Sequence, residues 1–240
     1  MSFLTTVNGT LLNALTVLIG GTLGTLVGNR LPQRIHEALF GVLGLVTVLI
    51  GLMGALATKN PLILLGSLLL GTILGEMVNL EGGLERAGEW LQKRMARSGS
   101  TLSEAFVTAS LVFCVGPLSV LGSLDNGLSG DTTKLVIKAT LDGFAALAFG
   151  ATLGWGVLLS IITVLVYQGG LSLSAHAIAP LLTHNADAIT ELTAAGGLIL
   201  VAVGLKLLKI RDLRVANYLP ALIFAPLLVA AVAVWPNIFR

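Results

Sequence analysis

The sequence of 240 residues is 55% hydrophobic and 11% charged, with a formal net charge of +2. Soluble domains carry about 25% charged residues, so this composition excludes an ordinary water-soluble protein. Uncharged stretches recur at the length that an α-helix needs to cross a bilayer, about 20 residues, over 1–29, 38–58, 105–124 and 215–239. Because these stretches are continuous rather than alternating, they exclude a transmembrane β-barrel. The sequence therefore predicts an all-α, polytopic transmembrane helical bundle.

The first part of the chain is predicted to form three spanning helices, at about 8–28, 38–57 and 62–80. The first of them carries Gly20, Gly24 and Gly28 at the spacing that permits close packing against another helix. A more polar segment follows over 81–97. Its apolar stripe is typical of an amphipathic linker helix that lies on the membrane surface.

A fourth helix is predicted over 104–123, and Gly116-Pro117 should kink or break it. A turn-rich loop is expected next, over 125–131. Beyond this loop the division into helices is ambiguous up to residue 190. The last two helices are expected over 192–208 and 215–235.

Basic residues predict the orientation, because loops rich in Lys and Arg stay in the cytoplasm. They gather in three short clusters, at 30–34, 86–97 and 206–214. Placing all three in the cytoplasm puts the N-terminus outside and requires an odd number of crossings between Asp131 and Lys206. Eight crossings with both termini outside is the preferred arrangement. Six crossings plus a re-entrant segment near 132–168 also satisfy the count, and a seven-helix arrangement ranks third because it leaves one basic loop outside.

A stripe of charge opens the ambiguous region. Lys134, Lys138 and Asp142 stand four residues apart, so a helix would place them on one face. Between 143 and 186 the chain has no Asp, Glu, Lys or Arg. Charges in a membrane span are costly unless they meet water, a partner or a ligand. Lys138 and Asp142 are therefore the first candidates for a substrate-binding or ion-binding site. The structural alternative is an ion pair between them, with the lysines reaching toward the headgroups.

Two further polar residues lie in predicted spans. Asn13 would either contact a substrate or hydrogen-bond between helices as a structural contact. Glu76 would either bind a proton or cation or lie at the membrane interface. Both belong to the candidate site.

No nucleotide-binding, zinc-protease or nucleophile-elbow motif occurs in the sequence. We therefore expect no enzyme activity, no metal or other cofactor and no nucleic-acid partner. The chain is expected to form one integral membrane domain over 1–240. Short matches between 20–24 and 150–154, and between 48–52 and 201–205, leave open a weak internal repeat of 8–80 against 140–235.

Seven short segments spread over the whole chain form a specific set: 1–5, 113–116, 127–131, 141–143 with Lys138, 167–169, 195–198 and 217–222. Together they resemble the YqgA/YdfK-like family of bacterial inner-membrane proteins, a family of unknown function. The resemblance implies a multi-pass helical protein of the bacterial inner membrane and no particular substrate. It also places Lys138, Asp142, Gln168 and Asn217 at positions of matching motifs, which adds Gln168 and Asn217 to the candidate site.

Two functions of different classes fit these observations. The leading hypothesis is a secondary transporter or channel for an ion or small polar solute, with its polar site around Lys138 and Asp142. The alternative is a non-transporting membrane scaffold or signalling protein that binds a partner through its cytoplasmic loops. The lipid bilayer is the expected surrounding, and the glycine-rich faces would be covered by helices of the same chain or by a second copy in a homo-oligomer.

Overall fold

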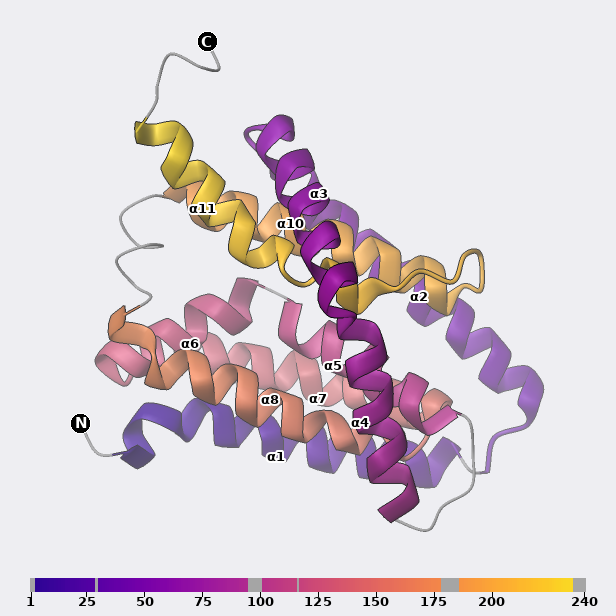
Figure 1. Cartoon of the computed structure of the whole chain (residues 1–240). Helices are drawn as coiled ribbons and strands as arrows, with labels where there is room; N and C mark the ends of the chain where they lie inside the picture. The colour runs from indigo at the N-terminus through magenta and orange to yellow at the C-terminus, as the bar shows by residue number, and fades with distance from the viewer. Residues whose placement is uncertain (1–2, 29, 95–100, 116, 178–185, 235–240) are drawn as a thin grey trace.

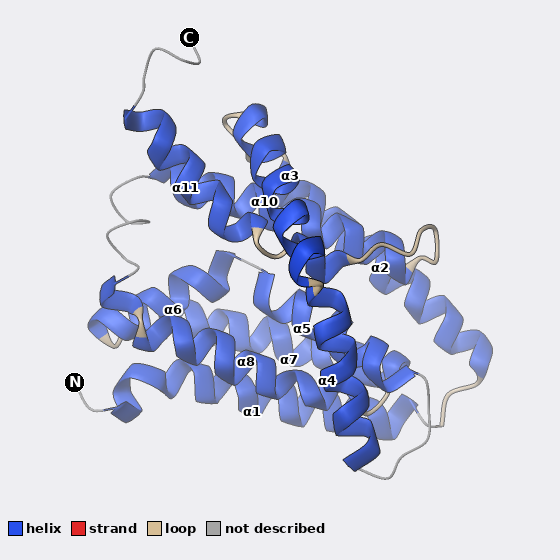
Figure 2. Ribbon diagram, viewed as in Figure 1, coloured by secondary structure: helices blue, strands red, loops and turns tan. Residues whose placement is uncertain are grey.

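The computed structural model describes residues 3–28, 30–94, 101–115, 117–177 and 186–234. Within these ranges the chain forms helices and turns and no strand, which confirms the all-α prediction (Figure 2). The helices are α1 (Phe3–Gly28), α2 (Gln33–Ala55), α3 (Pro61–Val78), α4 (Leu80–Arg94), α5 (Thr101–Val115), α6 (Pro117–Ser129), α7 (Thr133–Leu153), α8 (Gly156–Leu173), α10 (Ala186–Leu207), the 3-10 helix η1 (Val215–Tyr218) and α11 (Ala221–Val234).

Seven helices in the described ranges are long and apolar enough to cross a membrane, namely α1, α2, α3, α7, α8, α10 and the η1–α11 segment. The pair α5 and α6 passes the same test together, but it is bent by 62°. The predicted break at Gly116-Pro117 therefore falls between two helices, although Gly116 itself lies outside the described residues. The Ser119 hydroxyl donates to the carbonyl of Phe113 at 2.9 Å, which satisfies one backbone acceptor at the break.

The bent pair follows α8 along its whole length. Gly156 at the start of α8 lies against Leu102, and Gly127 in α6 lies against Ser172 near the end of α8. Between them, Ser110 hydrogen-bonds Thr163 at 2.9 Å. Counted as one span, the pair brings the candidate spans in the described ranges from seven to eight, the number that was preferred. The region left ambiguous by the sequence contains two complete helices, α7 and α8, rather than a re-entrant segment.

The helices pack into two groups, which we call the α1/α7 body and the α2/α10 body (Figure 1). The α1/α7 body contains α1, α5, α6, α7 and α8, and the α2/α10 body contains α2, α3, α10 and α11. In the first body α1 runs parallel to α7, with Gly24 against the carbonyl of Leu147 and Gly28 against that of Ala151. A Cβ atom at either glycine would overlap that oxygen, so the predicted close packing is confirmed.

In the α2/α10 body the main pairs are antiparallel. Gly44 of α2 lies against Gly204 of α10, and Gly54 lies against Gly197. In the same way, α3 runs antiparallel to η1 and α11. It follows that α1 begins, and α11 ends, on the same side of the bundle. We call this side the far end, and the opposite side, which carries α4 and the loop 208–214, the α4 end (Figure 1).

Two local expectations need correction or completion. The loop predicted over 125–131 is wrong for most of its length, because α6 continues to Ser129. Asn126 explains this, since its buried amide donates to the carbonyl of Thr5 at 3.0 Å and fastens α6 to α1. The predicted surface helix corresponds to α4, and residues 95–97 lie outside the described ranges.

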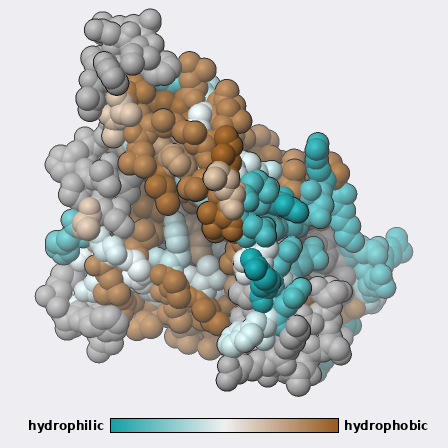
Figure 3. Space-filling view, viewed as in Figure 1, coloured by the Kyte–Doolittle hydropathy of each residue, from teal (hydrophilic) through white to brown (hydrophobic). Residues whose placement is uncertain are grey.

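The outer faces of the bundle are apolar. Phe144, Val166 and Met53 are 72%, 71% and 68% exposed, and hydrophobic surface covers α3 and α11 in Figure 3. Such faces would promote aggregation in water and suit contact with lipid. Hydrophilic surface gathers over α4 and the loop after α10 (Figure 3). The chain is therefore a multi-pass membrane protein.

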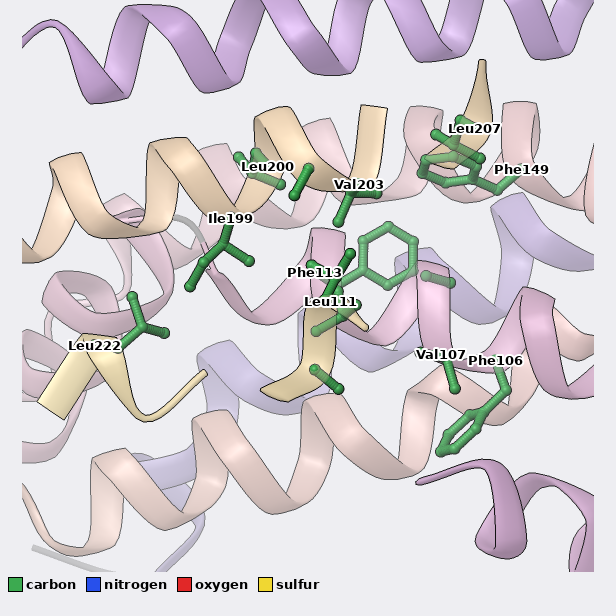
Figure 4. Packing of buried hydrophobic residues seen from close by; sticks show 14 of the residues in the cluster. Phe106, Val107, Leu111, Phe113, Phe149, Ile199, Leu200, Val203, Leu207 and Leu222 are labelled. Atoms are coloured by element: carbon green, nitrogen blue, oxygen red, sulfur yellow. The ribbon is translucent and has the colours of Figure 1, made fainter. Parts of the chain in front are cut away.

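The core joins the two bodies through α5 and α10. Leu111 and Phe113 of α5 lie beside Ile199 and Val203 of α10 (Figure 4). The ring of Phe113 also meets that of Phe149 on α7 edge to face, with centroids 6.2 Å apart. The position of α5 is thereby held from both sides.

Candidate functional site

Four of the six candidate residues meet inside the α1/α7 body. Lys138 and Asp142 come from α7, Asn13 from α1 and Gln168 from α8. The Asn13 amide nitrogen donates to Asp142 Oδ2 at 2.9 Å and to Gln168 Oε1 at 2.9 Å. Lys138 Nζ forms an ion pair with the same Asp142 oxygen. Asn13 therefore links the charged pair on one helix to the amide on another.

The ion pair follows from the four-residue spacing on α7, which places the two side chains on one face. The side chains of Lys138 and Asp142 are only 5% and 11% exposed, so the pair is almost completely removed from solvent. Lys134, the first member of the stripe, forms a more exposed ion pair with Asp125 of α6. The geometry of the Lys138–Asp142 pair is thus the one expected in the structural alternative, but both groups are buried rather than directed to the headgroups.

The site lies within the spanning segments. With a rise of 1.5 Å per residue, Asn13, Asp142 and Gln168 stand about 8 to 15 Å along their helices from the far end. That depth is below the headgroup region of a bilayer whose hydrocarbon core is about 30 Å thick. Ionised groups at this depth are rare and face a protein interior or a water-filled space.

Several buried polar atoms around the pair have no hydrogen-bond partner among the described residues. They are Asn13 Oδ1, Gln168 Nε2, Thr10 Oγ1 and Ser172 Oγ. Thr10 precedes Asn13 by one turn of α1, and Ser172 follows Gln168 by one turn of α8. Buried polar atoms nearly always have a protein or water partner. Four such atoms in one cluster indicate a place for water, an ion or a polar ligand.

A cavity of about 570 Å³ approaches the site from the seam between the two bodies. It is mostly apolar, but Cys114 and Tyr167 line it as well. Tyr167 is the neighbour of Gln168 in the chain, and Cys114 lies on α5. The cavity therefore lies beside α5 and α8, next in the chain to Gln168.

Glu76 and Asn217 lie elsewhere, so the structure does not bring them into the cluster. Glu76 forms an exposed ion pair with Arg214 at 3.2 Å, at the α4 end. Asn217 is buried in η1, and its side-chain oxygen accepts from the backbone N–H of Glu81 at 2.8 Å. Glu76 therefore joins α3 to the residue before η1, and Asn217 holds the start of α4 against η1.

Glu81 was not among the sequence candidates, although it is buried at the start of α4. Its Oε1 accepts from Lys206 Nζ at 3.0 Å, and its Oε2 accepts from the N–H of Ala216 at 2.7 Å. A second cavity, of about 400 Å³, opens beside it and is lined by charged residues that include Glu104 and Arg211. The sequence placed Glu81 on a surface helix, where a carboxylate needs no partner.

Glu191 was also missed. It is 1% exposed at the far end of α10, and it accepts from the N–H groups of Lys59 and Asn60 at 2.7 and 2.9 Å. The hydroxyl of Thr58 donates to its other oxygen at 2.7 Å. Glu191 stands one residue before the helix predicted over 192–208, and no pattern in the sequence singled it out. The carboxylate oxygens of Glu191 accept hydrogen bonds that hold the turn between α2 and α3.

Comparison with known proteins identifies relatives over almost the whole chain. The chain is 34% identical over 232 residues to a protein of Escherichia coli (strain K12) named "Uncharacterized protein YqgA", covering 95% of this chain and 98% of that one. It is 28% identical over 225 residues to the "Uncharacterized membrane protein YdfK" of Bacillus subtilis (strain 168), covering 92% and 95%. No solved structure matches the chain.

The model of one protein family matches residues 8–230, which include the ion pair and all or most of every candidate span. The match confirms the resemblance found in the sequence. The chain belongs to the family described as "Protein of unknown function (DUF554)".

Proposed function

We propose that this membrane protein is a secondary transporter or channel for an ion or small polar solute, which binds at Lys138, Asp142, Asn13 and Gln168. The observation that carries the proposal is the buried ion pair with unpartnered polar atoms beside it. A buried ion pair contributes little net stability, and well-packed apolar residues often replace one without loss. Ionisable residues inside a membrane protein most often mark the pathway of an ion or substrate.

Two cavities support an access route from the α4 end. The charged cavity beside Glu81 and the apolar cavity between the bodies share Leu111 as a lining residue. The apolar cavity then extends to Cys114 on α5 and to Tyr167, the chain neighbour of Gln168. A solute that entered beside α4 would pass Leu111 and approach the pair along α5.

The division into two bodies supports alternating access. All four site residues belong to the α1/α7 body, whereas α10 and α11 of the other body line the seam beside them. Rocking of one body against the other around a buried site is the usual movement of secondary transporters. By the distribution of basic residues, the α4 end faces the cytoplasm of a bacterial inner membrane and both termini lie outside.

The test is flux through the purified full chain in proteoliposomes. Monovalent and divalent ions and small polar solutes are applied one at a time, and uptake is measured by isotope or by solid-supported membrane currents. Asp142→Asn should abolish flux of the transported species. Asp131→Asn is the matched control, since Asp131 is an exposed carboxylate near the same end.

Two results would refute the proposal: no tested species moves, or Asp142→Asn transports as the unchanged protein does. A stoichiometric partner that is captured through α4, together with absence of flux, would favour the scaffold alternative.

A further inference from the structure

The unpartnered oxygen atoms near the ion pair share one chemistry. Thr10 Oγ1, Asn13 Oδ1 and Ser172 Oγ are hydroxyl and amide oxygens on side chains that are at most 1% exposed. Both hydrogen bonds that the described residues give to the carboxylate of Asp142 end on Oδ2, so Oδ1 is left as a further oxygen. Neutral oxygens together with one carboxylate are ligands for a hard cation.

The fold places these oxygens on one seam. Thr10 and Asn13 are three residues apart on α1, and Ser172 lies four residues after Gln168 on α8. The methyl carbon of Thr10 stands 4.0 Å from the position that a Cβ atom would take at Gly169, so α1 and α8 approach closely at this level. Since α8 runs antiparallel to α1, Thr10 and Ser172 both lie one turn toward the far end from the Asn13–Gln168 hydrogen bond.

We infer that this seam is a binding site for a monovalent cation such as Na⁺, and that the ammonium group of Lys138 is the internal cation that occupies Asp142 when Na⁺ is absent. The inference rests on the proposed function and names monovalent cations as its substrate class. One carboxylate balances one positive charge, which favours a monovalent over a divalent ion. The ligands are the Asp142 carboxylate, Asn13 Oδ1, Thr10 Oγ1 and Ser172 Oγ.

The ammonium group of Lys138 can move to the membrane interface when Na⁺ binds at Asp142. Lys138 lies five residues from the start of α7, about 8 Å along the helix from the far end. A lysine side chain can extend its ammonium group over such a distance to water and headgroups at the interface. Binding of Na⁺ therefore exchanges one cation for another at Asp142, and two positive charges never share the buried site.

The test measures Na⁺ binding to the purified full chain, in detergent, with choline as the replacement cation. Binding of radioactive Na⁺ is followed by scintillation proximity at constant pH. Thr10→Val and Ser172→Ala should each weaken Na⁺ binding at least tenfold. Thr25→Val is the matched control on α1, because its hydroxyl already donates to the carbonyl of Gly21 at 2.7 Å. This control should leave Na⁺ affinity unchanged.

Two further measurements test whether the ammonium group of Lys138 is the internal cation. Lys138→Met should bind Na⁺ at least tenfold more tightly, because its competitor for Asp142 is gone. In the unchanged protein, saturating Na⁺ should increase the rate at which a water-soluble acylating reagent modifies Lys138, as measured by mass spectrometry. The absence of Na⁺ binding would overturn the inference, as would equal affinities for Thr10→Val and Thr25→Val, or looser binding by Lys138→Met.

The outcome can be separated from that of the flux experiment. Flux of some other solute without Na⁺ binding refutes the cation site and leaves transport standing. Na⁺ binding that depends on Thr10 and Ser172, without flux of any species, establishes the cation site and refutes transport.

Discussion

Replacing the two members of the buried ion pair, singly and together, tests how the site is held. Lys138→Met leaves the Asp142 carboxylate buried with the Asn13 amide as its only donor among the described residues. Because the carboxylate is only 11% exposed, we expect a loss of about 3 to 5 kcal/mol in the free energy of unfolding. Asp142→Asn should cost less, roughly 1 to 3 kcal/mol, since the freed lysine can extend to the far interface.

The double variant Lys138→Met/Asp142→Asn removes both charges together. Its stability should lie within about 1 kcal/mol of the unchanged protein, because no uncompensated charge remains. The assay is equilibrium unfolding in mixed detergent micelles containing choline in place of Na⁺, followed by tryptophan fluorescence. If the cost in the double variant equals the sum of the two single costs, the side chains act independently and the reasoning is refuted.

Two other contacts give sharp predictions in the same unfolding assay. Gly24→Ala should destabilise the protein by about 1 to 3 kcal/mol, since the added methyl group overlaps the carbonyl of Leu147. The control Gly170→Ala meets no atom within 4 Å and should be neutral or slightly stabilising. Equal stabilities of the two variants would contradict the packing of α1 on α7. Glu191→Leu should cost about 2 to 4 kcal/mol by removing the carboxylate acceptor of the N–H groups at 59–60, while Glu191→Gln should cost about 1 kcal/mol. Equal losses for Gln and Leu would show that the charge, not the acceptor, matters.

The spans and the local geometry of α7 could be predicted from the sequence because they depend on short-range patterns. Continuous apolar runs determine spanning helices, and four-residue spacing pairs Lys138 with Asp142. The site as an assembly depends on contacts between residues 129 and 155 positions apart in the chain. Asn13 could be proposed as a candidate, but composition and periodicity do not show which helix it faces.

The polar residues that the sequence analysis misplaced or missed have one physical feature in common. Glu76, Asn217 and Glu191 all lie near helix ends, where a polar side chain can meet solvent, a backbone turn or a neighbouring helix. The choice depends on which loop packs there: Arg214 meets Glu76, and the turn after α2 meets Glu191. The sequence alone does not distinguish these helix ends, so Glu76 was grouped with the buried pair and Glu191 was not singled out.

The parallel packing of α1 on α7 has a consequence for how the protein is made. About 100 residues separate the two helices, which a ribosome adds in about 5 to 20 s. During that time the glycine face of α1 and the amide of Asn13 lie in the bilayer before α7, their final neighbour, has been made. A lone Lys or Asp at the centre of an inserting helix costs about 2.5 to 3.5 kcal/mol. Because Lys138 and Asp142 pair within α7, the charges inside this helix neutralise each other before it meets α1, and only Lys134 at its first turn keeps an unbalanced charge within the helix.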